Sequence, residues 1–211
     1  MRPSPDYAAR TLRFPDDRVV GDVRFVGEDG RPEDPIPAQG AVEVPAGKAA
    51  AFFGNPERVD LADATGLSHL FLNGEIDREW ADLLATFPYL RQIKTGTRGL
   101  TADGMEKLLS APVLARVDLN VVDEDEGGAA IVAAVAAVDD VEVSLTLGPA
   151  AVPKVCELVS AGAVSDTVTI DVAGAEERDL LPLRKLLPDS ELNGIRYSPK
   201  ALARLEASLP S

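Results

Sequence analysis

The chain has 211 residues, with 35 acidic and 21 basic side chains and a formal net charge of −14. This length suits one core of ordinary size, because single domains usually contain about 100–200 residues. The acidic excess predicts that the chain binds neither nucleic acid nor a membrane surface, since both are bound through clusters of Lys and Arg.

The first 57 residues predict a small β-rich cap. Short β-like runs at residues 23–26, 41–44 and 49–53 are separated by turn-rich segments, and 8 of the 16 prolines fall in residues 1–56. Such prolines interrupt strand pairing, so we expect a small antiparallel sheet with irregular connections. Residues 1–10, which contain two prolines, are expected to pack loosely.

The composition changes after this segment, and residues 58–211 are predicted to form the second unit. Of 25 leucines, Leu12 alone lies in residues 1–56. The pattern L-x-x-L-x-L, or a close variant of it, then begins at Leu67, Leu90, Leu114 and Leu192, and weaker copies keep Leu145/Leu147 and Ile170/Val172. The middle positions of these copies are 70, 93, 117, 145, 170 and 195. This spacing predicts a repeat architecture with a strand in each copy.

A helical pattern lies between successive copies. Apolar residues stand at i, i+3, i+4 and i+7 from Trp80, from Ile131 and from Val152. Asp77 and Thr101 precede their helices as N-caps, and Ser198 followed by Pro199 predicts the start of a last helix that covers the end of the stack. Trp80 and Cys156 belong to these apolar patterns, so we expect both side chains to pack against the core.

The repeated segments resemble the leucine-rich repeat superfamily, specifically its ribonuclease-inhibitor-like strand–helix type. Leu100–Leu108 resembles the turn into the helix of such a repeat, and the N-terminal part is similar to the β-rich leader of some bacterial leucine-rich repeat proteins. The resemblance implies an α/β fold: a short solenoid of about six strand–helix units with a parallel sheet on its concave face, a β-rich N-terminal cap over residues 1–57 and a C-terminal capping helix. The asparagine ladder of many family members is missing, since Glu75 and Arg98 stand at its first two positions.

The residues between the core positions of each strand are predicted to line the concave face, because strand side chains alternate between faces. One column then contains His69, Gln92, Arg116 and Ser144, and the next contains Phe71, Lys94, Asp118, Thr146 and Asp171. Arg and aromatic residues anchor many interfaces. The candidate partner-binding residues are His69, Phe71, Gln92, Lys94, Arg116, Asp118, Asp171 and Arg196.

These residues predict a non-catalytic, cytoplasmic adaptor or scaffold that binds another protein on the concave sheet. His69 is the only histidine, no sequence pattern places a nucleophile beside it, and phosphate-binding and dinucleotide-binding glycine motifs are absent. With a single cysteine, no Cys/His cluster predicts a metal site, so neither a metal nor a cofactor is expected. Two alternatives stay open: an acidic inhibitor or immunity-type protein that neutralises a basic target, and a structural protein that associates with itself.

Overall fold

The computed structural model describes most of the chain and gives a mixed α/β fold. The residues that it describes are 5–27, 30–56, 61, 63–121, 126–136, 138–165, 167–187 and 199–208. The expected strand at residues 192–197, and with it Arg196, lies outside these residues.

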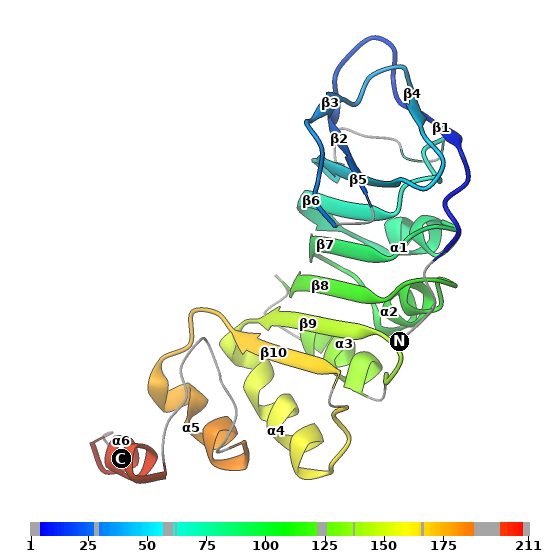
Figure 1. The fold of residues 1–211 in the computed structure, drawn as a ribbon. Coiled ribbons are helices and arrows are strands. Elements are labelled where there is room, and N and C mark those ends of the chain that lie inside the picture. The colour runs from blue at the N-terminus through cyan, green and yellow to red at the C-terminus, as the bar shows by residue number, and fades with distance from the viewer. Residues whose placement is uncertain are drawn as a thin grey trace.

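An eight-stranded, mostly parallel sheet runs through the described part of the chain, in the order β10-β9-β8-β7-β6-β5-β2-β3, and β1 and β4 pair separately (Figure 1). The five strands of the N-terminal part are β1 (Arg10–Arg13), β2 (Gly21–Val26), β3 (Ile36–Pro37), β4 (Ala41–Val44) and β5 (Ala49–Gly54). The later strands are β6 (His69–Ile76), β7 (Gln92–Thr97), β8 (Arg116–Val121), β9 (Glu142–Leu147) and β10 (Val168–Val172). From β5 to β10 every neighbouring pair is parallel.

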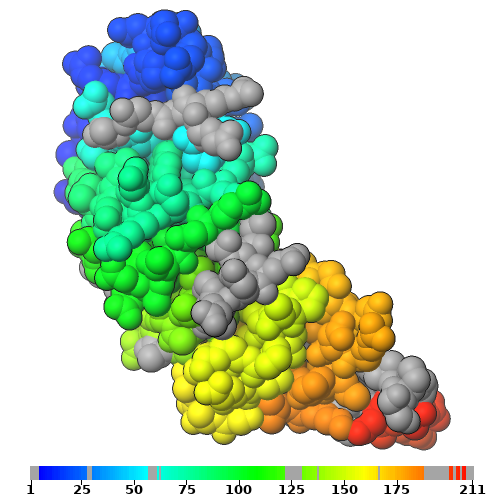
Figure 2. All heavy atoms as spheres, turned by 180° about the vertical axis from the view of Figure 1, so that it is seen from behind, coloured from blue at the N-terminus to red at the C-terminus, as the bar shows by residue number. Residues whose placement is uncertain are grey.

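A helix connects each strand to the next between β6 and β10. These connections contain α1 (Arg78–Leu84), α2 (Ala102–Leu109), α3 (Glu126–Ala136) and α4 (Val152–Ser160), which follows the short 3-10 turn η2 (Pro149–Ala151). Two further helices, α5 (Glu177–Leu186) and α6 (Pro199–Ser208), follow β10. Figure 1 shows a curved stack with the sheet on its inner side and the helices on its outer side, and Figure 2 shows the same elongated curve from behind. No helix in the described part of the chain is both long enough and apolar enough to cross a membrane.

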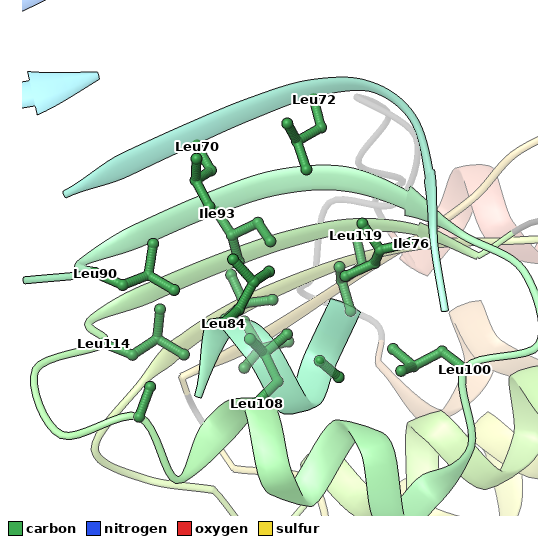
Figure 3. Close-up of a cluster of buried hydrophobic side chains, with 14 of the residues drawn as sticks. Leu70, Leu72, Ile76, Leu84, Leu90, Ile93, Leu100, Leu108, Leu114 and Leu119 are labelled. Atoms are coloured by element: carbon green, nitrogen blue, oxygen red, sulfur yellow. The ribbon is translucent and has the colours of Figure 1, made fainter. Parts of the chain in front are cut away.

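The repeated apolar positions form the core between the sheet and the helices. Leu67, Leu70, Leu90, Ile93 and Leu114 are fully buried. Figure 3 shows Leu70 of β6 and Ile93 of β7 on the side of the sheet that faces Leu84 of α1 and Leu108 of α2. The N-caps are as expected: Asp77 accepts a hydrogen bond from the backbone N–H of Trp80, and Thr101 accepts one from that of Gly104. Trp80 and Cys156 are partly buried and pack against the core.

Three strands of the N-terminal part, β2, β3 and β5, share one sheet with the later strands. β5 pairs antiparallel with β2, as expected, but it also pairs in parallel with β6, with Phe53 opposite Phe71. The hydrophobic core is likewise continuous, because Leu12 and Phe52 belong to the same buried cluster as Leu70. The change of composition near residue 57 therefore does not interrupt the sheet.

The N-terminal segment packs more closely than expected for residues 1–10. Among its described residues, Tyr7 lies against Tyr89 with ring centroids 6.0 Å apart, and the Arg10 guanidinium lies 4.7 Å from the Tyr89 ring. Arg10 also donates a hydrogen bond from Nε to the carbonyl of Gly66 at 2.6 Å. Arg10 thus ties the first strand to the connection that leads into β6, which composition alone did not indicate.

The strand register corrects the predicted alignment of the fourth and fifth copies. Val117 lies opposite Val143, and Val143 lies opposite Val168. The middle positions are therefore 70, 93, 117, 143 and 168, at intervals of 23, 24, 26 and 25. Consequently Asp171 is not in the column of Lys94 and Asp118, which contains Ser144 and Thr169 instead.

Candidate functional site

The candidate site lies on the face of the sheet that points away from helices α1 to α4, which we call the open face. Strand pairing arranges its side chains in rows that cross the strands. The first row contains Arg24, Ala51, His69, Gln92, Arg116 and Glu142. The second row contains Asp22, Phe53, Phe71, Lys94, Asp118 and Ser144. No helix connecting β6 to β10 covers these rows, because those helices pack on the other face (Figure 1).

Two aromatic rings stack at the start of the open face. Phe53 and Phe71 have ring centroids 4.6 Å apart and planes within 9° of each other. The guanidinium of Arg24 lies 5.1 Å from the Phe53 ring. Both rings are partly exposed, in contrast to the fully buried Phe52 one residue earlier. This Phe53–Phe71 pair is therefore an ordered apolar surface that solvent reaches.

An arginine and a carboxylate are fixed to each other on β8. Arg116 donates hydrogen bonds to Asp118 from Nε and from Nη2, both at 3.0 Å, and these contacts raise the pKa of Arg116. Gln92 on β7 donates to the same carboxylate at 3.2 Å. The side chain of Asp118 is only 15% exposed, whereas that of Arg116 is 51% exposed. The negative charge of Asp118 is thus paired and largely covered.

Lys94 lies between the aromatic pair and Asp118. Its neighbours in the row are Phe71 on one side and Asp118 on the other. The side chain is exposed and has no ion-pair partner among the residues that the structure describes. Glu75, further along β6, is held by Arg98 at 2.9 Å. Within the described part of the chain, Lys94 therefore offers a positive charge with no ion-pair partner, although the chain as a whole is acidic.

A shallow hollow of about 580 Å³ lies beside Lys94. Its wall contains the polar side chains of Asn73, Asn120, Ser144 and Thr146. An irregularity of β6 shapes one side: Phe71 pairs with Lys94 but Glu75 pairs with Gly96, so residues 72–74 lie opposite Thr95 alone. A bulge of this kind bends a strand and turns its side chains in new directions. The loop of extra residues forms one rim of the hollow.

The His69 imidazole is neutral at pH 7. Burial, followed by the charge of Arg91, lowers its pKa to about 4. The adjacent Ser68 hydroxyl lies 2.9 Å from Nδ1 of His69. That hydroxyl is fully buried, donates to the carbonyl of Ala50 and accepts from its N–H, so it links β5 to β6. Ser68 is thus held as a buried bridge to β5.

The structure brings six of the eight candidate residues together. His69, Phe71, Gln92, Lys94, Arg116 and Asp118 occupy adjacent positions on β6, β7 and β8. Asp171 lies apart, on β10, in a third row with Asn120 and Thr146. Arg196 lies outside the described residues.

The sequence interpretation missed Phe53 and Arg24. Both belong to the segment that was predicted to form a separate cap, so no alignment placed them beside Phe71. The pairing of β2 with β5 and of β5 with β6 adds them to the open face. For Phe53 the available signal was its adjacency to Phe52, because successive strand side chains point to opposite faces and the two rings could not both enter one core.

Among the described residues, no group of three or more His, Cys, Asp or Glu side chains is placed to hold a metal ion. Comparisons with protein-family models, with curated proteins and with solved structures gave no significant match.

Proposed function

We propose that the chain is a non-catalytic protein-binding module, built as a short solenoid of the leucine-rich-repeat type, and that it binds another protein on the open face. The observation that carries this proposal is the Phe53–Phe71 pair beside Lys94, which has no ion-pair partner among the described residues. Both lie on the sheet face that helices α1 to α4 leave uncovered. Stacked rings and a free cation provide both apolar contact and charge recognition. An adaptor or scaffold in the cytoplasm would use such a surface.

Rigidity of the open face supports this function. Strand pairing fixes the backbone, and the contact of Arg116 with Asp118 fixes two of the charged groups. A surface ordered before binding loses little conformational entropy when the partner arrives. The module would therefore act by presenting a preformed surface and not by changing its fold.

Photo-crosslinking tests where the partner binds. In one variant Gln92 on the open face is replaced by p-benzoylphenylalanine, and in a second variant the exposed Asp82 on α1 is replaced. Each variant is irradiated in the cells that naturally contain the chain. We expect a covalent adduct with one protein from position 92 and none from position 82. An adduct from position 82 alone would contradict the proposal, and an adduct of twice the chain's mass would support self-association instead.

The net charge of −14 is the observation that favours the alternative, an inhibitor of a basic target. Association with a basic protein would be accelerated by electrostatic attraction, and salt would slow it steeply. Measuring the association rate of the crosslinked partner at low and at moderate salt distinguishes an inhibitor of a basic target from an adaptor. A steep decrease with salt would favour the inhibitor, and a flat or rising rate favours the adaptor.

A further inference from the structure

The row that crosses β5, β6 and β7 has the spacing of a peptide-binding site. Resting on the protein-binding function proposed above, we propose that the open face takes an extended segment of the partner protein that carries an aromatic residue and, two positions away, an Asp or Glu. The aromatic side chain lies over the Phe53–Phe71 pair and the carboxylate pairs with Lys94.

The Phe53–Phe71 pair provides the apolar half of the site. The two rings lie parallel and are partly exposed, so a third ring or a large aliphatic side chain can contact both of them at once. Aromatic pairs prefer offset or edge-to-face contacts with centroids about 4.5–7 Å apart, and the edges of the two partly exposed rings allow the edge-to-face geometry. Arg24 already lies over Phe53 from the side of β2, so the ligand side chain lies across the exposed edges of both rings and does not extend the stack.

The charge pattern selects an acid as the second ligand group. Lys94 is exposed without an ion-pair partner in the described structure, while the nearby carboxylates of Asp118 and Glu75 are held by Arg116 and Arg98. A basic ligand side chain in this position would meet the ammonium group of Lys94 and only carboxylates that are already paired. An acidic side chain gains a charge-assisted hydrogen bond from Lys94.

The distance between these two halves matches an extended chain. Neighbouring strands lie about 4.8 Å apart, so the midpoint of Phe53 and Phe71 is about 7 Å from Lys94 along the row. Side chains on one face of an extended chain repeat every two residues, at about 6.6 Å. An extended segment that crosses the strands therefore places residue i over the aromatic pair and residue i+2 at Lys94.

The hollow beside Lys94 provides room for the peptide residues beyond the acid. It is about 580 Å³ in volume and carries the amides of Asn73 and Asn120 and the hydroxyls of Ser144 and Thr146. These groups both donate and accept hydrogen bonds, which suits the backbone of a peptide that continues toward β8 and β9.

A charge exchange tests the site. Two fluorescent peptides differ at one position: their cores are Phe-Ser-Asp and Phe-Ser-Lys, each flanked by Gly and Ser. Fluorescence polarisation measures the binding of each peptide to three full-length proteins, namely the wild type, Lys94→Glu and Lys107→Glu. Lys107 is exposed on α2, and either substitution changes the net charge from −14 to −16. Only a local effect therefore separates the two variants.

We expect the wild-type protein to prefer the Phe-Ser-Asp peptide. The Lys94→Glu variant should lose about tenfold in affinity for that peptide and prefer Phe-Ser-Lys. The Lys107→Glu variant should behave as the wild type does. The melting temperature of each variant confirms that it is folded, and Lys94→Gln provides a milder second variant. A preference of the wild type for Phe-Ser-Lys, equal behaviour of the two Glu variants, or no binding of either peptide would overturn the proposal. If crosslinking from position 92 still captures a protein in those cases, the binding function stands and only the peptide chemistry is wrong.

Discussion

Arg116 holds the carboxylate of Asp118, two residues further along β8, through Nε and Nη2. Because the two charges are paired with each other, neither is free to pair with a charged group of a ligand on the open face. Because Asp118 is also the row neighbour of Lys94, it determines how much positive charge the open face presents.

Replacing Asp118 with Asn is expected to strengthen binding of the Phe-Ser-Asp peptide about three- to tenfold, because the change removes a carboxylate beside Lys94 and releases Arg116. Fluorescence polarisation measures this, with Asp82→Asn on α1 as a control of equal charge. Unchanged or weaker binding by Asp118→Asn would show that the open face does not recognise acidic groups.

The bulge of β6 requires a glycine on β7. A Cβ at Gly96 would lie 2.9 Å from the carbonyl oxygen of Gly74, which belongs to the backbone and cannot turn aside. We expect Gly96→Ala to lower the free energy of unfolding by about 1–3 kcal/mol, as overpacked positions do. Urea unfolding measures this value. Gly148→Ala serves as the control, because nothing lies within 4 Å of the added Cβ, and equal stability of the two variants would contradict the close approach.

Much of the alternation of strands and helices could be predicted from spacing. Leu70, Ile93 and Val117 lie in register on neighbouring strands, as their shared place in the pattern indicated. Each is fully buried, because each points toward the helices. A periodic apolar pattern specifies which face of a strand is buried, and here it also specified the order of the strands.

The register of β9 could not be predicted, for a physical reason. Val141, Val143, Leu145 and Leu147 are all buried and alternate with polar residues, so a shift of two residues leaves the same face inward. Asp140 stands where earlier copies have their first leucine, which removed the one feature that would have fixed the alignment. The position of Asp171 was wrong for this reason.

The aromatic half of the site was missed because it depends on a pairing between distant segments. Nothing in the local sequence of β5 indicates that it continues the parallel sheet beside β6. Phe53 therefore had no predicted neighbour. The paired state of Arg116 was missed as well, because it depends on side-chain conformation and not on spacing.

The contact of Arg10 with Tyr89 is expected to stabilise the fold. Arg10 loses its hydrogen bond to Gly66 and its ring contacts when changed to Ala, which we expect to cost about 1–3 kcal/mol of unfolding free energy. A double-mutant cycle with Tyr89→Ala should give a coupling energy of about 0.5–2 kcal/mol. Arg13→Ala, an exposed position on the same strand, is the control. Additive effects of the two Ala substitutions would show that the guanidinium and the ring do not interact.

Acid should destabilise the protein through His69. Its pKa is lowered to about 4 in the folded state, against about 6.5 in an unfolded chain, so folding disfavours the protonated form. Above pH 6.5 His69 is neutral in both states, so it does not lower the free energy of unfolding. As the pH falls toward 4, the unfolded chain gains the proton first, and the free energy of unfolding falls by up to about 3 kcal/mol. Urea unfolding at pH 7 and pH 4.5 should show a larger loss for the wild type than for His69→Gln. Equal losses, or an NMR titration of His69 with a midpoint near 6.5, would refute this.

Lysine footprinting tests most directly whether the open face is the binding surface. The chain, alone and in complex with the partner that crosslinking identifies, is treated briefly with an amine-reactive acetylating reagent, and mass spectrometry compares Lys94 with Lys107 on α2. If the open face is the binding surface, the partner slows acetylation of Lys94 several-fold and leaves Lys107 unchanged. Unchanged acetylation of Lys94 with protection of Lys107 would place the partner on the helices and show that the open face is not the binding surface.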